Sequence, residues 1–209
     1  HYYLTSRKEE VSISQKNMEF LLKKAHPLMD IYREERKKEL HASLLENAGK
    51  EGRRRRVLAV PDLGVLPKKL LEEILERNHV VLNEKTVILE SYKRSATCLE
   101  TILKHSVVED EVSVLSEAEY EKYPLVLPLA ECFLEKDIRL TYEEYHACIG
   151  AAENYAKANE NYQFNLTKIK GFHNIQITCF EGKWCMISKN RAPAIHFVIH
   201  HPKLRYALE

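Results

Sequence analysis

The sequence lacks the short motifs by which many enzyme classes are recognised. It has no G-x-S-x-G, H-E-x-x-H or C-x-x-C pattern, and no H-x-E followed by P-C-x-x-C. Neither glycine-rich phosphate signature, G-x-G-x-x-G or G-x-x-x-x-G-K, is present. These absences leave hydrolase, zinc-enzyme, deaminase and nucleotide-binding functions without support, so we expect no catalytic constellation, no metal and no cofactor.

The sequence also lacks an excess of positive or negative charge, and it has no long apolar run. The formal net charge is +1, which argues against a surface built mainly for nucleic acid or anionic lipid. No stretch approaches the roughly 18 apolar residues of a membrane helix. The content of 44% hydrophobic and 30% charged residues, with 6 Gly and 7 Pro, is typical of a globular protein.

Cysteine is sparse, and its spacing is irregular. The five cysteines form no framework and are odd in number, which favours reduced thiols and a cytoplasmic location over a set of disulfides. The chain begins "HYYLTSRKEE" without Met, so we expect a fragment of a longer protein.

Helical periodicity dominates the first fifty residues. Apolar side chains recur at steps of three and four before Pro27, and a second helix is predicted over residues 28–49 with Gly49 as a left-handed C-terminal residue. We therefore predict a helical extension over 1–50, a candidate for dimerisation, and an α+β sensor domain over 51–209.

The central region alternates strand and helix signals. A short strand near residue 56 leads through a Pro/Asp/Gly loop into a helix that begins near Pro67, and a long helix follows from Asn83. "EVSVLS" is predicted to be a strand followed by a capping box, and "TYEEY" begins a further capped helix.

In the last third of the sequence, apolar residues alternate with polar ones, as they do along β-strands. "YQFNLTKI", "NIQITCF", "KWCMISK" and "AIHFVIH" are four short apolar runs separated by turn signals. Strands that follow one another so closely favour an antiparallel meander of about four strands. The fold class is therefore α+β, with helices packed on one face of the sheet.

The histidines and the single tryptophan are candidates for a ligand pocket. On a strand, His196 and His200 share one face but lie roughly 13 Å apart, too far for one metal ion. If "EG" is a two-residue turn, Cys179 pairs with Trp184 and Cys185 points to the opposite face, whereas a three-residue turn would reverse this. The simpler interpretation is that Trp184 packs in the hydrophobic core, and the alternative is that it lines a ligand cavity.

Two features precede the first predicted central helix. Asp62 follows an apolar strand at the place where α/β proteins commonly bind ligands, although it could simply cap the turn. The arginine run could contact phosphate or nucleic acid, or it could form a salt-bridged entry to the strand. The phosphate candidates are Arg53, Arg54, Arg55 and Arg56. The ligand candidates are Asp62, Trp184, His196 and His200.

Two segments carry a resemblance to a known family. "RRRRVLAVPDLGVLPKKLLEEIL" and "FHNIQITCFEGKWCMISKNRAPAIHFVIHHPKLRYALE" resemble the regulatory region of bacterial Xre-type helix-turn-helix transcriptional regulators. The resemblance implies a non-enzymatic signal-sensing or dimerising module in the cytoplasm, with a small-molecule effector. DNA would be contacted only through a separate head outside this chain. The alternative is a small-substrate enzyme with a cleft near Asp62 and with His196 or His200 as acid or base.

Overall fold

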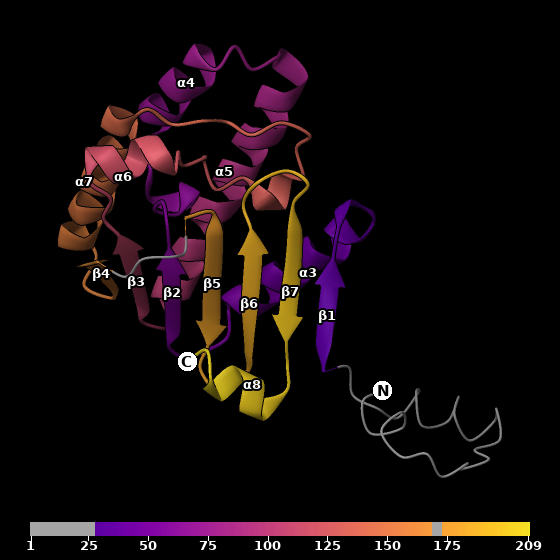
Figure 1. Ribbon diagram of the computed structural model, residues 1–209. Coiled ribbons are helices and arrows are strands. Elements are labelled where there is room, and N and C mark those ends of the chain that lie inside the picture. Colours follow the sequence, from indigo (N-terminus) through magenta and orange to yellow (C-terminus); the bar gives the residue numbers. More distant parts are fainter. Residues whose placement is uncertain (1–27, 169–172) are drawn as a thin grey trace, which may run out of the picture.

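A seven-stranded mixed sheet organises the protein (Figure 1). The computed structural model describes residues 28–168 and 173–209. The strand order is β1-β7-β6-β5-β2-β3-β4. The strands are β1 (Met29–Tyr32), β2 (Arg54–Leu58), β3 (Val108–Ser113), β4 (Tyr162–Thr167), β5 (Ile175–Phe180), β6 (Trp184–Lys189) and β7 (Ile195–Ile199).

The sheet has a parallel half and an antiparallel half that meet at β2. Strands β2, β3 and β4 run parallel to one another, and β5 pairs antiparallel with the other edge of β2. Strands β5, β6 and β7 form an antiparallel meander, which β1 completes. The α+β class and the C-terminal meander predicted from the sequence are therefore confirmed.

Helices cover one face of this sheet, on the far side in Figure 1. Helices α3 and α5 lie behind the antiparallel half and β2, and α4, α6 and α7 continue the layer toward β3 and β4 (Figure 1). The helices are α3 (Lys37–Ala48), α4 (Lys68–Arg77), α5 (Leu82–Leu103), α6 (Glu117–Lys122), α7 (Tyr142–Ala158) and α8 (Pro202–Tyr206). Three 3-10 turns are η1 (Glu34–Arg36), η2 (Leu63–Val65) and η3 (Ala130–Cys132).

The main core fills the space between this helical layer and the sheet. Leu58 and Val112 from the sheet are fully buried, as are Leu71 on α4, Ile88 on α5 and Tyr145 on α7. Complete burial of a large apolar side chain stabilises a fold by roughly 1.5–3 kcal/mol. The core therefore fixes α5 against β2, and the site described below lies along this seam.

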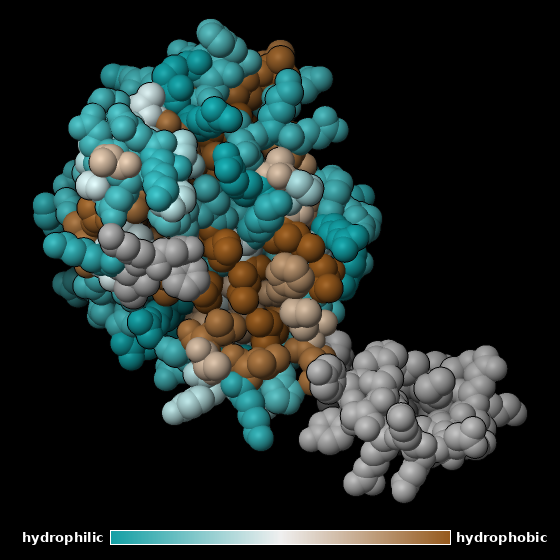
Figure 2. All heavy atoms as spheres, in the orientation of Figure 1, coloured by the Kyte–Doolittle hydropathy of each residue, from teal (hydrophilic) through white to brown (hydrophobic). Residues whose placement is uncertain are grey.

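The opposite face of the sheet has little helical cover. In Figure 2, apolar side chains gather over β5, β6 and β7. They include Ile177 and Ile187, which are paired in register across β5 and β6. Leu208, at the C-terminal end, packs against part of this surface. The two faces thus differ sharply, since one carries the main core and the other an apolar surface.

Several local predictions are confirmed. Pro67 is the N-cap of α4, and the long helix from Asn83 corresponds to α5. Capping boxes begin α6 at Ser116 and α7 at Thr141, where side chain and backbone bond reciprocally. These features depend on neighbouring residues alone, which is why the sequence reveals them.

Three predictions about local structure are wrong. Residues 29–32 form strand β1 instead of the start of a helix, because they pair with β7 at the sheet edge. Gly49 ends α3 but has φ −82°, so it is not left-handed. Strand β4 leaves the meander and pairs parallel with β3. The predicted helix before Pro27 lies outside the described residues, and the boundary at residue 50 stays a prediction.

Candidate functional site

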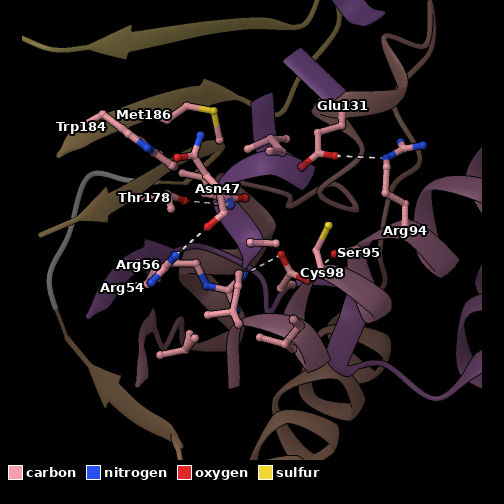
Figure 3. Close-up of a pocket in the computed structure, with 17 residues that line it drawn as sticks. Asn47, Arg54, Arg56, Arg94, Ser95, Cys98, Glu131, Thr178, Trp184 and Met186 are labelled. Atoms are coloured by element: carbon pink, nitrogen blue, oxygen red, sulfur yellow. Dashed lines mark hydrogen bonds and ion pairs between the residues drawn. The ribbon is translucent and has the colours of Figure 1, made fainter. Parts of the chain in front are cut away.

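A cavity lies between the covered face of the sheet and the helices (Figure 3). Its walls come from α3, from β2 and the loop after it, from α5, from η3, and from β3, β5 and β6. The polar and sulfur-containing lining residues include Asn47, Arg54, Arg56, Asp62, Arg94, Ser95, Cys98, Glu131, Gln176, Thr178, Trp184 and Met186. Apolar lining comes from Leu44, Ala48, Leu99, Ile102 and Val108.

Arg56 forms the rigid floor of this cavity. Its guanidinium donates two hydrogen bonds to Asp110, from Nε at 2.6 Å and Nη2 at 2.7 Å, and a third to Asp62 from Nη1 at 2.9 Å. Tyr162 donates a fourth bond to the Asp110 carboxylate at 2.6 Å. Burial disfavours the charged form of Arg56, but Asp110 and Asp62 together raise its pKa above the ordinary value. Asp110 is completely buried, so this network is charge-paired and closed.

Asp62 links the floor to α5. Its Oδ1 accepts hydrogen bonds from the Gly64 amide at 2.8 Å and from the Ser95 hydroxyl at 2.7 Å. A Cβ at Gly64 would lie 3.0 Å from the Ser95 backbone, a tight contact, so this close approach favours glycine. Asp62 therefore both caps η2 and lines the cavity, and the two sequence interpretations of this residue are compatible.

Arg54 stabilises the end of α3. Its guanidinium donates to the carbonyl oxygens of Asn47 at 2.8 Å and Lys50 at 2.7 Å, and to that of Gly52. The same group stacks over the ring of Phe180, 3.6 Å from its centroid. Burial lowers the pKa of Arg54 to about 10. Its donors are occupied by the chain's own carbonyl groups, which satisfy the C-terminal turn of α3.

Glu131 has a different environment from the other two acids. Its carboxylate receives no hydrogen bond from the described residues, and its ion-pair partner is Arg94, whose Nε lies 3.9 Å from Oε2. The side chain stays 33% exposed where it lines the cavity. Burial, and next the charge of Asp62, raise the pKa of Glu131 to about 7, against the opposing effects of Arg94 and Arg56.

Helix α3 closes the cavity beside Glu131. His41 Nε2 lies 3.0 Å from the Glu131 carbonyl oxygen, and Lys37 donates to the Cys132 carbonyl at 3.2 Å. Both contacts reach the backbone of η3 and leave the carboxylate of Glu131 untouched. Burial lowers the pKa of His41, which favours its neutral form near neutral pH. These bonds hold η3 in place and so position Glu131.

Trp184 and Met186 form the wall across from Glu131 (Figure 3). The predicted turn register is wrong, because Glu181, Gly182 and Lys183 make a three-residue loop and Phe180 pairs with Trp184. Trp184 and Met186 therefore point to the helix-covered face instead of sharing a face with Cys179. The indole Nε1 is buried and has no hydrogen-bond partner among the residues that the structure describes.

The same change of register brings Cys179 and Cys185 together. They face each other across β5 and β6 and form a disulfide, with their Cα atoms 4.1 Å apart. The expectation of reduced thiols is thus wrong for this pair, while Cys98, Cys132 and Cys148 are free. The pair lies on the sheet face away from the cavity and does not contribute to the site.

His196 and His200 occupy separate places. His196 is buried and lines a smaller cavity that shares Asp62, Glu131 and Met186 with the main one. Its Nδ1 lies 2.8 Å from the Ser188 hydroxyl, and burial lowers its pKa to about 4. His200 is exposed and contacts Asp30 at 3.1 Å, and it lines neither cavity.

The outward members of the arginine run pair with acids on the adjacent strand. Arg53 bonds Glu109, and Arg55 bonds Glu111 at 3.1 Å, because β2 and β3 run parallel in register. With Arg54 and Arg56 turned inward, all four guanidinium groups have partners within the chain. This arrangement matches the salt-bridged alternative, and phosphate binding by the run stays a prediction.

The site therefore joins some predicted residues with others that the sequence did not suggest. Asp62 and Trp184 line one cavity, with His196 next to it. Glu131 and Arg94 were missed, although an acid inside the apolar run "YPLVLPLAECFLE" is a usable signal. Within residues 28–168 and 173–209, no group of His, Cys, Asp and Glu is arranged to hold a metal ion, and no helix could cross a membrane.

Comparison with known proteins finds no matching family model, no matching curated sequence and no matching solved structure. The functional argument therefore depends on the cavity itself.

Proposed function

We propose that this chain is the signal-sensing region of a bacterial transcriptional regulator and binds a small-molecule effector in the cavity between α5 and the sheet. In this proposal it is not an enzyme, acts in the cytoplasm as a homodimer, and reaches DNA through a separate helix-turn-helix head. The resemblance of residues 53–75 and 172–209 to Xre-type regulators supports the regulatory part of the proposal.

One observation carries the ligand-binding part. Glu131 lines a cavity, and its carboxylate accepts no hydrogen bond within the described chain. A partly buried acid without hydrogen bonds is costly to a fold, because part of its hydration is lost without replacement. A ligand that supplies the missing donor would recover that free energy, so the cavity is suited to reversible binding.

The position of the cavity also suits a sensor. Its walls belong to α3, α5 and η3 on one side and to four adjacent strands, β6, β5, β2 and β3, on the other. A ligand in contact with both layers can bind one relative position of α3 and the sheet more tightly than another. Differential affinity of this kind is what shifts a protein between two states.

Native mass spectrometry of the protein purified from the cell tests this function. We expect a dimer with a small molecule retained, and we expect a Cys98→Phe variant, which fills part of the cavity, to lose that molecule while staying dimeric. Circular dichroism would show that the variant is folded. An empty monomer with no ligand from cell extracts would contradict the proposal.

A specific observation also favours the second candidate, a small-substrate enzyme. Asp62 is bonded to Arg56, Ser95 and Gly64, whereas Glu131 has a pKa of about 7, and two carboxyl groups in such different environments can act as acid and base. His200 lines neither cavity and does not fit the role suggested for it. Conversion of the retained molecule by the wild-type protein, lost in Glu131→Gln, would establish this alternative.

A further inference from the structure

Three carboxyl groups lie at or next to the cavity, and two of them are fully engaged. Asp110 is bonded by Arg56 and Tyr162, and Asp62 by Arg56, Ser95 and Gly64. Only Glu131, among these three, presents oxygen atoms that no donor of the described chain reaches. It is therefore the carboxyl group at the cavity with the most unused bonding capacity.

Two of the three lining arginines offer little to an anionic ligand. Arg54 and Arg56 are occupied by backbone carbonyl groups and by carboxylates. Arg94 donates from Nη2 to the Ser91 hydroxyl at 3.1 Å, and its Nε makes no hydrogen bond within the described residues and faces Glu131 as an ion-pair partner at 3.9 Å. In Figure 3, Glu131 lies between Arg94 and Trp184, so a molecule beside Trp184 reaches the glutamate first.

The electrostatic environment of Glu131 is also suited to a cation. Burial and the nearby charge of Asp62 raise the pKa of Glu131, and Arg94 and Arg56 only partly offset them. On α3, Lys37 and His41 bind backbone carbonyl groups of η3, and they leave the carboxylate without a close ammonium or imidazolium partner. An ammonium group placed beside Glu131 would supply the hydrogen bonds that Arg94, at 3.9 Å, does not make.

The remaining walls define the other part of the ligand. Leu44, Leu99 and Ile102 line the cavity together with Met186 and the indole of Trp184. This apolar part of the wall accepts a compact apolar group, because a charge placed against it would lose its hydration without compensation.

From these contacts we propose that the effector is a small organic cation, with an ammonium group bound to Glu131 and a compact apolar part against Trp184 and Met186. This inference rests on the proposed function, since it names the ligand class for the same cavity. The ammonium donates hydrogen bonds to both carboxylate oxygens, and the apolar part is removed from water between α5 and β6.

Trp184 gives a selective readout because it is the only tryptophan in the chain. Its indole N–H contributes one side-chain signal to a ¹H–¹⁵N NMR spectrum, from a group in the cavity wall. Three probes of similar size separate the chemistry: n-butylammonium chloride, butan-1-ol and sodium butyrate. At pH 8 the amine is charged and Glu131 is predominantly ionised, so the titrations compare a cation, a neutral molecule and an anion.

We expect n-butylammonium to shift the Trp184 signal with a Kd at least fivefold lower than that of butan-1-ol, and butyrate to cause no shift. Glu131→Gln keeps the shape of the side chain but removes the charge, so it should weaken amine binding at least tenfold. The matched control is Glu135→Gln, four residues away on an exposed position outside the cavity, which should bind as the parent does.

Each other outcome has a distinct meaning. If butan-1-ol or butyrate binds as tightly as the amine, or if Glu131→Gln keeps the preference for the amine, the cation assignment is wrong while the cavity remains a ligand site. If no probe shifts the Trp184 signal of the folded protein, the cavity is not a ligand site, and the proposed function fails together with this inference. Backbone NMR signals of each variant show whether it is folded.

Discussion

Asp110 and Glu131 are two acids on the same side of the sheet with opposite surroundings. Asp110 is completely buried and receives three hydrogen bonds, two from Arg56 and one from Tyr162. Glu131 receives none from the described chain and keeps a third of its side chain exposed to the cavity. The comparison shows two ways in which this fold holds an acid beside its core: Asp110 has its hydrogen-bond donors built in, whereas Glu131 has only an ion pair with Arg94 at 3.9 Å.

Removal of the charge of Asp110 should have the largest effect. Asp110→Asn leaves the guanidinium of Arg56 buried without its two-bond partner, so we expect the free energy of unfolding to fall by about 3–5 kcal/mol. Urea denaturation followed by circular dichroism measures this loss. The control is Glu109→Gln on the same strand, whose partner Arg53 is half exposed, and there we expect a loss of about 1 kcal/mol or less. Equal losses in the two variants would show that the Asp110 network is not special.

The hydroxyl of Tyr162 should matter less than the charge of Asp110. Burial and the adjacent Asp110 raise the pKa of Tyr162, so the hydroxyl keeps its proton and donates to the carboxylate. Tyr162→Phe removes that donor and should lower the free energy of unfolding by about 1–2 kcal/mol. Tyr155→Phe on α7 is the matched control and should change little. A loss no larger than that of the control would remove Tyr162 from the network.

The smallest effect should be a pH dependence contributed by Glu131. Its pKa is about 7 in the fold and near 4 when unfolded, so its protonation stabilises the protein progressively as pH falls from 7 toward 4. Glu131→Gln should therefore be more stable than the parent at pH 8, by about 1 kcal/mol after screening by solvent, and the difference should vanish by pH 4.5. Chemical denaturation of both proteins at several pH values measures the difference.

The contributions of other titrating groups cancel when Glu131→Gln is compared with the parent protein, because both proteins contain them. Burial lowers the pKa of His196 to about 4, so the fold binds the neutral imidazole. Its contribution to the free energy of unfolding is fully present above the ordinary histidine pKa and is lost as the pH falls toward 4. This contribution has the opposite sign and is present in both proteins. A stability difference that does not vary with pH would show that Glu131 has an ordinary pKa.

The sequence predicted the parts of the fold that depend on neighbouring residues. The capping boxes at Ser116 and Thr141 and the apolar stripe of α5 follow from spacings of three and four residues. Strand β1 was missed because its partner β7 lies near the other end of the chain. The turn after Phe180 was assigned two residues instead of three, and one residue was enough to move Trp184 to the opposite face.

The candidate site was predicted only in part, for the same reason. Asp62 could be placed at a strand end by a general rule, but its bonds to Arg56 and Ser95 depend on the packing of β2 against α5. The pairing of Arg56 with Asp110 follows from the parallel register of two strands that are far apart in sequence. Glu131 lies in a segment whose structure the sequence left open, so its position was visible only in the folded chain.

Strand β1 also affects how the protein is made. Met29 pairs with Ile199, so β1 leaves the ribosome long before its only partner in the sheet has been synthesised. At translation rates of about 5–20 residues per second, that wait is on the order of ten seconds. During this time the backbone groups of β1 that will pair with β7 have no partner in the sheet, so this edge is completed only at the end of synthesis.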